Sequence, residues 1–114
     1  MSHPTAAQLI EAVQLFLKEA EGELTGRLAF HAKVAGNTLA IVNRELAQNP
    51  ETTEAEALAP FGGVAAACED LRNGRLDPSD KALLRAIRKG VLARCAVDNP
   101  RYASFTRLTE REIA

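Results

Sequence analysis

The chain has 114 residues, a length that predicts one domain with a modest hydrophobic core. Its 14 basic and 15 acidic residues leave a formal net charge of -1, which argues against a nucleic-acid surface or a polybasic membrane anchor. Apolar residues make up 46% of the chain, yet aromatic residues only 4%. Alanine and leucine therefore supply most of the apolar bulk, which favours closely packed helices over a β-sandwich.

The first predicted helix covers about residues 5–21. Thr5 is a suitable N-cap, and Gln8 stands three residues later, where its side chain reaches back to the cap. Behind this start signal, apolar residues recur at helical spacing and form one stripe about four turns long. The stripe consists of Ala6, Leu9, Val13, Phe16, Leu17 and Ala20.

The second predicted helix covers about residues 23–48 and ends before Asn49-Pro50. One of its faces is apolar along the whole length, and Phe30, Val34 and Ile41 extend this apolar sector. A flank of small residues permits close approach of a neighbouring backbone. The face comprises Leu24, Leu28, Ala32, Ala35, Leu39, Val42 and Leu46, and the flank Ala29, Gly36, Ala40 and Ala47. A helix that is apolar over most of its circumference must be covered on several sides. It is therefore the centre of a bundle or a surface for another protein.

A third helix is expected over about residues 53–73, capped by Thr52 or Thr53 and broken near 60–63. The next helix is expected over about 78–97, with Asp77 as N-cap and proline at its first position. Residues 98–114 are expected to form an irregular tail that is extended or contains a turn or short helix. The sequence thus predicts an all-α fold: a small antiparallel bundle of about four helices in a single domain, residues 1–114.

Two cysteines, Cys68 and Cys95, lie far apart and form no CxxC motif. We expect them to be reduced thiols, packed as small hydrophobic residues. The N-terminus has no apolar signal core, and no segment approaches the roughly 18 apolar residues of a membrane span. These features indicate a cytoplasmic protein of bacterial type that does not bind a membrane.

His31 is the one histidine within a predicted helix, and it has alanine four residues later, so the metal-binding HExxH pattern is absent. We expect His31 to be half-buried and hydrogen-bonded to a neighbouring helix, or else to contact a partner. Gly62-Gly63 has no P-loop around it. We therefore expect no metal and no cofactor. A basic stripe on the later helix is either solvated surface or a dock for an acidic or phosphate-bearing partner; it comprises Arg85, Arg88, Lys89 and Arg94.

The most specific local sequence is AVDNPRYASF, residues 96–105. Asn99 precedes a proline and must leave the α region, and Asp98 or Asn99 is suited to an Asx turn. Arg101 and Tyr102 then project from a rigid corner, and arginine and tyrosine are enriched at interaction hot spots. The corner is either a simple helix stop or a binding surface.

The segment GRLAFHAKVAGNTLAIVNREL, residues 26–46, together with AVDNPRY, residues 96–102, resembles a family of small bacterial helical proteins. The opening PTAAQLIEAVQLFL agrees with the first helix of that family. Such proteins are encoded beside aminoglycoside-phosphotransferase-like kinases and acyl-CoA dehydrogenases. They are similar to the small accessory subunit of the 4-hydroxyacyl-CoA kinase of levulinic-acid catabolism. The likeness is carried by Arg27, Phe30, His31, Val34, Ala35, Asn37, Leu39, Ala40, Ile41, Arg44, Glu45, Asp98, Asn99, Pro100, Arg101 and Tyr102.

The resemblance implies a non-catalytic accessory subunit of a phosphotransferase-like kinase that acts on hydroxyacyl-CoA. The residues expected to contact this kinase are Arg27, Phe30, His31, Asn37, Arg44, Asp98, Asn99, Arg101 and Tyr102. Two alternatives stay open. One is a self-associating homodimer whose second helix packs against its copy. The other is a small ligand-binding or enzymatic bundle that uses His31, Arg44 and Tyr102.

Overall fold

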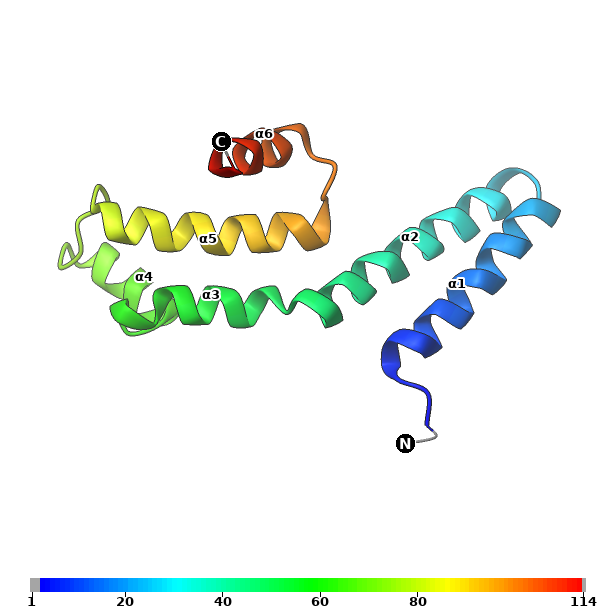
Figure 1. Ribbon diagram of the computed structural model, residues 1–114, viewed down its shortest axis with the longest axis horizontal. Coiled ribbons are helices and arrows are strands. Elements are labelled where there is room, and N and C mark those ends of the chain that lie inside the picture. The colour runs from blue at the N-terminus through cyan, green and yellow to red at the C-terminus, as the bar shows by residue number, and fades with distance from the viewer. Residues whose placement is uncertain (1–2, 114) are drawn as a thin grey trace. The chain divides into compact units, whose positions relative to one another are not determined.

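The structure, a computed structural model, describes residues 3–113, with side chains as far as residue 110. Every regular element in this part of the chain is a helix, so the all-α prediction is confirmed (Figure 1). The chain divides into two compact units, Met1–Ala47 and Gln48–Ala114. In chain order the elements are α1 Ala6–Glu23, α2 Gly26–Gln48, α3 Pro50–Leu58, the 3-10 turn η1 Ala59–Phe61, α4 Val64–Arg72, α5 Lys81–Asp98 and α6 Ala103–Ile113.

The first unit is a helical hairpin made of α1 and α2. The capping box predicted at the start of α1 is confirmed: the Gln8 N–H donates to Thr5 Oγ1 over 3.1 Å, and the Thr5 N–H donates to Gln8 Oε1 over 2.8 Å. Gly26 adopts a positive φ of 62° and reverses the chain into α2. At mid-height the Gln14 Nε2 donates to the carbonyl oxygen of Gly36 over 3.4 Å, which fixes the register of the two helices.

The small-residue flank of α2 faces α1. Ala29, Gly36 and Ala40 of this flank are half-buried, Ala47 is exposed, and Ala32 at the adjoining edge of the apolar face is buried. The predicted close backbone approach is wrong at Gly36, however, because a Cβ built on this glycine would meet no atom within 4 Å. α2 continues unbroken through Gly36 and ends at Gln48, where Asn49 takes a left-handed φ of 48°.

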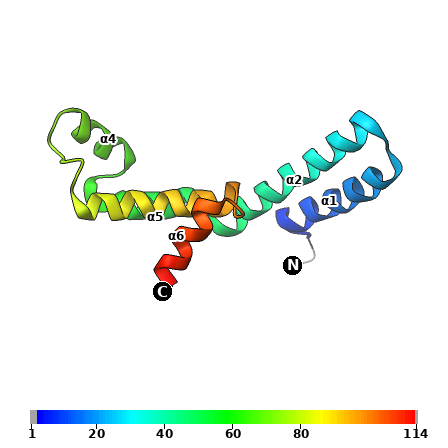
Figure 2. The same ribbon diagram turned by 90° about the horizontal axis from the view of Figure 1, so that it is seen from above.

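The second unit is held together by α3 and α5, which lie side by side and run in opposite directions (Figures 1 and 2). Gly90 on α5 allows the close approach, since a Cβ there would stand 3.2 Å from the Glu54 Cγ on α3. The buried core contributed by α3, α4 and α5 consists of Leu58, Ala67, Leu83 and Ala86. Ala57, Phe61, Leu71 and Leu76 pack around it.

The predicted caps of α3 and α5 are wrong. α3 begins at Pro50, before Thr52 and Thr53, because proline is suited to the first helical position. α5 is capped by Asp80, whose Oδ1 accepts from the Leu83 N–H over 2.9 Å. Asp77 instead closes an Asx turn, and its Oδ1 accepts from both the backbone N–H and the hydroxyl of Ser79. These hydrogen bonds lower the pKa of the Asp77 carboxyl below its ordinary value of 3.8.

One further expectation for the second unit needs correction, and an open alternative is decided. Cys68 is exposed, because Ala67 faces the core and the next residue is turned by about 100° away from it. Cys95 is half-buried, and both thiols are free. The tail takes the short-helix alternative: α6 packs against α5, with Phe105 and Leu108 half-buried.

The core of the second unit makes a direct prediction about stability. Leu83 is only 1% exposed, so Leu83→Ala leaves a cavity and should lower the free energy of unfolding by about 2–5 kcal/mol. The neighbouring Leu84 is 49% exposed, and Leu84→Ala should change that free energy by about 0.5 kcal/mol or less. Urea unfolding followed by circular dichroism measures both variants. Equal losses from the two substitutions would contradict the packing described for α5.

Candidate functional site

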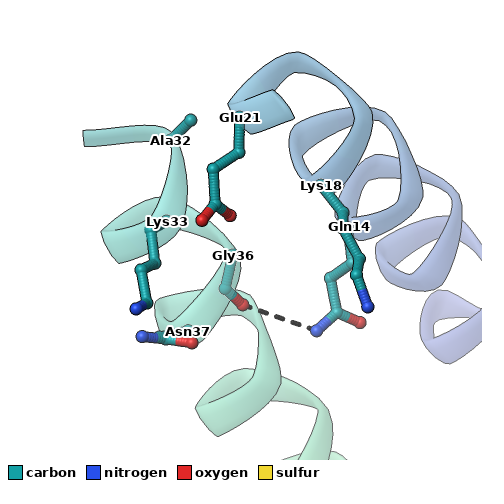
Figure 3. Close-up of a pocket in the computed structure, with 7 residues that line it drawn as sticks. All are labelled: Gln14, Lys18, Glu21, Ala32, Lys33, Gly36 and Asn37. Atoms are coloured by element: carbon teal, nitrogen blue, oxygen red, sulfur yellow. Dashed lines mark hydrogen bonds between the residues drawn. The ribbon is translucent and has the colours of Figure 1, made fainter. Parts of the chain in front are cut away.

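The hairpin contains a cleft of about 270 Å³ between α1 and α2 (Figure 3). Gln14, Lys18 and Glu21 line it from α1, and Ala32, Lys33, Gly36 and Asn37 line it from α2. The hydrogen bond between Gln14 and the Gly36 carbonyl spans the two helices that line it. The two ammonium groups outnumber the single carboxylate, so the cleft favours an anionic group. Asn37 is the one predicted contact residue among its lining residues.

The outward flank of α2 carries Arg27, Phe30 and His31, all exposed. The rings of Phe30 and His31 meet edge to face, with centroids 5.8 Å apart. The expectation that His31 is half-buried is therefore wrong. α1 faces the small-residue flank of α2, and helical geometry turns His31 away from that flank. Phe30 and His31 together form an exposed aromatic contact surface.

Arg44 lies farther along α2 and is half-buried, with an interaction of its own. It is 13 residues from His31 on one helix, which corresponds to about 20 Å along the helix axis. A small ligand cannot contact both side chains at once, and Tyr102 belongs to the other unit.

The corner after α5 is built differently from the predicted Asx turn. A backbone hydrogen bond closes it: the Tyr102 N–H donates to the Asn99 carbonyl over 3.1 Å. Asp98 instead forms an ion pair with Arg94 one helical turn earlier, with Arg94 Nη1 3.9 Å from Asp98 Oδ1. All four predicted contact residues of the corner, Asp98, Asn99, Arg101 and Tyr102, are exposed. Tyr102 retains 52% of its surface accessible.

Seven of the nine predicted contact residues thus form two groups, and Asn37 and Arg44 belong to neither. Arg27, Phe30 and His31 lie on one flank of α2 in the first unit, and the corner residues lie in the second unit. Part of the predicted basic stripe also lines an open groove on α5, formed by Arg85, Arg88, Lys89 and Leu92. Arg94 is not among the residues of this groove, and its guanidinium is paired with Asp98.

Sequence reasoning missed the exposure of α1. Its stripe was expected to pack into a bundle, yet Leu9 is 55% exposed and Phe16 66%. Periodicity identified the stripe correctly but could not tell which of its flanks would meet α2. The half-buried residues of α1 combine one edge of the stripe with the mixed flank beside it, and they are Ala7, Ile10, Gln14, Leu17, Ala20 and Glu21.

Within residues 3–113, no group of three or more histidine, cysteine, aspartate or glutamate side chains is placed to hold a metal ion. Over the same residues, no helix combines the length and the apolar character needed to cross a membrane.

One buried polar atom of the hairpin has no hydrogen-bond partner among the residues described. The Oδ1 of Asn43 on α2 is buried without a hydrogen bond among the described residues. An unsatisfied buried acceptor costs about 1–3 kcal/mol, so Asn43→Leu should raise the free energy of unfolding by a comparable amount. The matched control is Asn37→Leu, because Asn37 is exposed on the same helix. Thermal unfolding measures both, and a lower midpoint for Asn43→Leu alone would contradict this role.

Comparison with known proteins adds a family to this description. The sequence family described as a domain of unknown function, DUF6285, matches residues 22–102, from the end of α1 to the corner after α5. No curated protein and no solved structure matches the chain.

Proposed function

The chain belongs to the DUF6285 family, and we propose that it is a non-catalytic accessory subunit of a phosphotransferase-like kinase acting on hydroxyacyl-CoA. The proposal rests on the resemblance of residues 26–46 and 96–102 to the accessory subunit of such a kinase. It places the protein in acyl-CoA metabolism in the bacterial cytoplasm.

The observation that supports it best is the outward flank of α2. Phe30 is 63% exposed and Val34 43%, although both side chains are large and apolar. Exposed apolar surface that is rimmed by polar residues is typical of a protein interaction site. Arg27 and His31 supply such a rim beside Phe30. A partner that covers this flank removes apolar surface from water without needing a nucleophile or a metal from this chain.

The corner after α5 supplies the second group of contacts. Arg101 and Tyr102 are exposed, and side chains of these two types contribute strongly to many protein interfaces. The two guanidinium groups, Arg27 and Arg101, are suited to carboxylates of the kinase or to the phosphates of a CoA ester at a shared active site.

Co-expression with the neighbouring phosphotransferase-like kinase tests the proposal. The two proteins should elute together in size-exclusion chromatography at micromolar concentration, and kinase activity should depend on the complex. Phe30→Asp should weaken the complex by about tenfold or more, because it places a charge in the covered apolar surface.

The control variant is Leu15→Asp. Leu15 is 71% exposed on α1, on the opposite side of that helix from the Leu9 stripe, so its substitution adds the same charge outside the proposed interface. Separate elution of the two wild-type proteins would contradict the proposal. Equal weakening by Phe30→Asp and Leu15→Asp would contradict the assignment to the flank of α2.

A further inference from the structure

The hairpin of α1 and α2 exposes a continuous apolar face. On α1 the stripe lies to one side of the flank that meets α2, and on α2 the apolar face lies to one side of the small-residue flank that meets α1. Because the helices are antiparallel, both apolar surfaces emerge on the same face of the hairpin. The polar cleft opens on the opposite face. The exposed members of the apolar face are Leu9, Val13, Phe16, Leu24, Leu28, Val42 and Leu46.

This apolar face requires another surface that shields it from water. Ala32 is the only buried residue of the first unit among those described, so the hairpin has almost no core of its own. Isolated helices are marginal in water, and most helical stability in proteins comes from packing of an amphipathic face. We call the seven exposed residues the hairpin face.

The size of the hairpin face matches what a dimer requires. Exposed fractions range from 37% for Leu24 to 66% for Phe16. A large apolar side chain presents on the order of 150 Å² when fully exposed, so the seven together expose roughly 500–600 Å². Adding the polar rim brings this near the roughly 800 Å² that each partner contributes to a standard interface.

We propose that the hairpin face is covered by the hairpin face of a second copy of this chain, about a two-fold axis that runs along the helices. In this arrangement α1 of one copy packs on α2 of the other, with both turns at the same end. All neighbouring helices are then antiparallel, and the four helices form a bundle with a shared apolar core.

The register within the hairpin determines which residues meet. The Gln14–Gly36 hydrogen bond places these two residues at the same height. Both helices rise by the same amount per residue, so Glu23, nine residues after Gln14, is level with Arg27, nine residues before Gly36. Glu19 and His31, each five residues from that bond, are level in the same way.

A two-fold axis along the helices leaves the height of every residue unchanged. The outer rim of α1, with Glu19 and Glu23, therefore lies beside the outer rim of α2 of the other copy, with His31 and Arg27. Each acidic group meets a basic or titratable group across the interface, and all four side chains are exposed in the single chain. Phe16 comes within one residue of the height of Ala35, so a large side chain meets a small one.

An axis that runs across the helices is less favourable. It stacks α1 on α1, so Glu19 and Glu23 lie beside the N-terminal half of the other α1, whose one charged residue is the like-charged Glu11. Arg27 then faces the region of Glu45, a residue that already has an interaction within its own chain. The charge pattern therefore selects the axis along the helices.

The apolar contact is tested by light scattering coupled to size exclusion on the full chain. The wild-type protein should have twice its chain mass of 12.3 kDa, and Phe16→Asp should raise the dimer dissociation constant at least tenfold. Leu15→Asp, at the adjacent and equally exposed position on the other side of α1, should leave the dimer unchanged. A monomeric wild-type chain at every concentration, or equal effects of the two variants, would overturn the proposal.

The two-fold arrangement is tested by mixing two charge-reversed chains. Glu23→Arg alone places two guanidinium groups together across the interface, because the substituted side chain lies beside Arg27 of the other copy. Arg27→Glu alone places two carboxylates together, so each variant should dimerise at least fivefold more weakly than wild type. When the two are mixed, both contacts across the interface become complementary, and the heterodimer should regain wild-type affinity. Circular dichroism of each variant shows whether the helices are retained.

Mixing also shows that the regained affinity comes from contacts between the chains. Within each variant chain, residues 23 and 27 carry the same charge whichever partner it binds, so no contact inside one chain improves. Failure of the mixture to exceed the two separate variants would overturn the axis along the helices. The kinase complex is tested at Phe30, on a different flank of α2 from the hairpin face. If the kinase complex survives Phe16→Asp, the proposed function stands even where the dimer fails. If the dimer survives Phe30→Asp, the dimer stands even where the kinase complex fails.

Discussion

The contact between α1 and α2 is the constraint from which the other properties of the first unit follow. The two helices shield one strip of each from water, although their backbones stay farther apart than those of α3 and α5. That strip is the small-residue flank of α2 against a mixed flank of α1. Ala29, Gly36 and Ala40 offer little apolar area. Leu17 of the α1 stripe and Leu39 of the α2 apolar face are half-buried, but the other large side chains of these two surfaces are exposed. The hairpin is consequently a unit whose largest apolar surface is turned toward water.

In the second unit, by contrast, the helices bury their large apolar side chains in a core. α3 approaches α5 at Gly90, where the absence of a side chain leaves room for Glu54. Leu58 and Leu83 then meet inside a core that α4 completes, and Leu83 is 1% exposed. Three helices suffice here because α4 returns across the gap after the turn at Gly62-Gly63. Among its described residues, the first unit has no third helix of its own that could cover the apolar surfaces of α1 and α2.

Local signals in the sequence were read most successfully where the chemistry is confined to neighbouring residues. Thr5 and Gln8 form their capping box because both partners stand within one turn. The cap of α5 was misplaced because Asp77 and Asp80 are both suited to it, and only the structure shows that Ser79 occupies the Asp77 carboxylate. Helical periodicity located the apolar stripes but did not show which neighbouring element packs against each of them. The exposure of His31 and Cys68 depends on which flank a neighbouring helix meets, and spacing along one helix carries no information on that choice.

The arrangement of exposed groups around α2 separates two kinds of contact on one helix. The hairpin face includes Leu28 and Leu46, while Phe30 and Val34 point to another flank. A helix with two such surfaces can be shielded on one by a copy of itself and still present the other to a different protein. The wide apolar sector of α2 is thus not an excess of hydrophobicity in a single core helix. It is the sum of a contact with α1 and two further surfaces, which share Arg27 and His31 at the border between them.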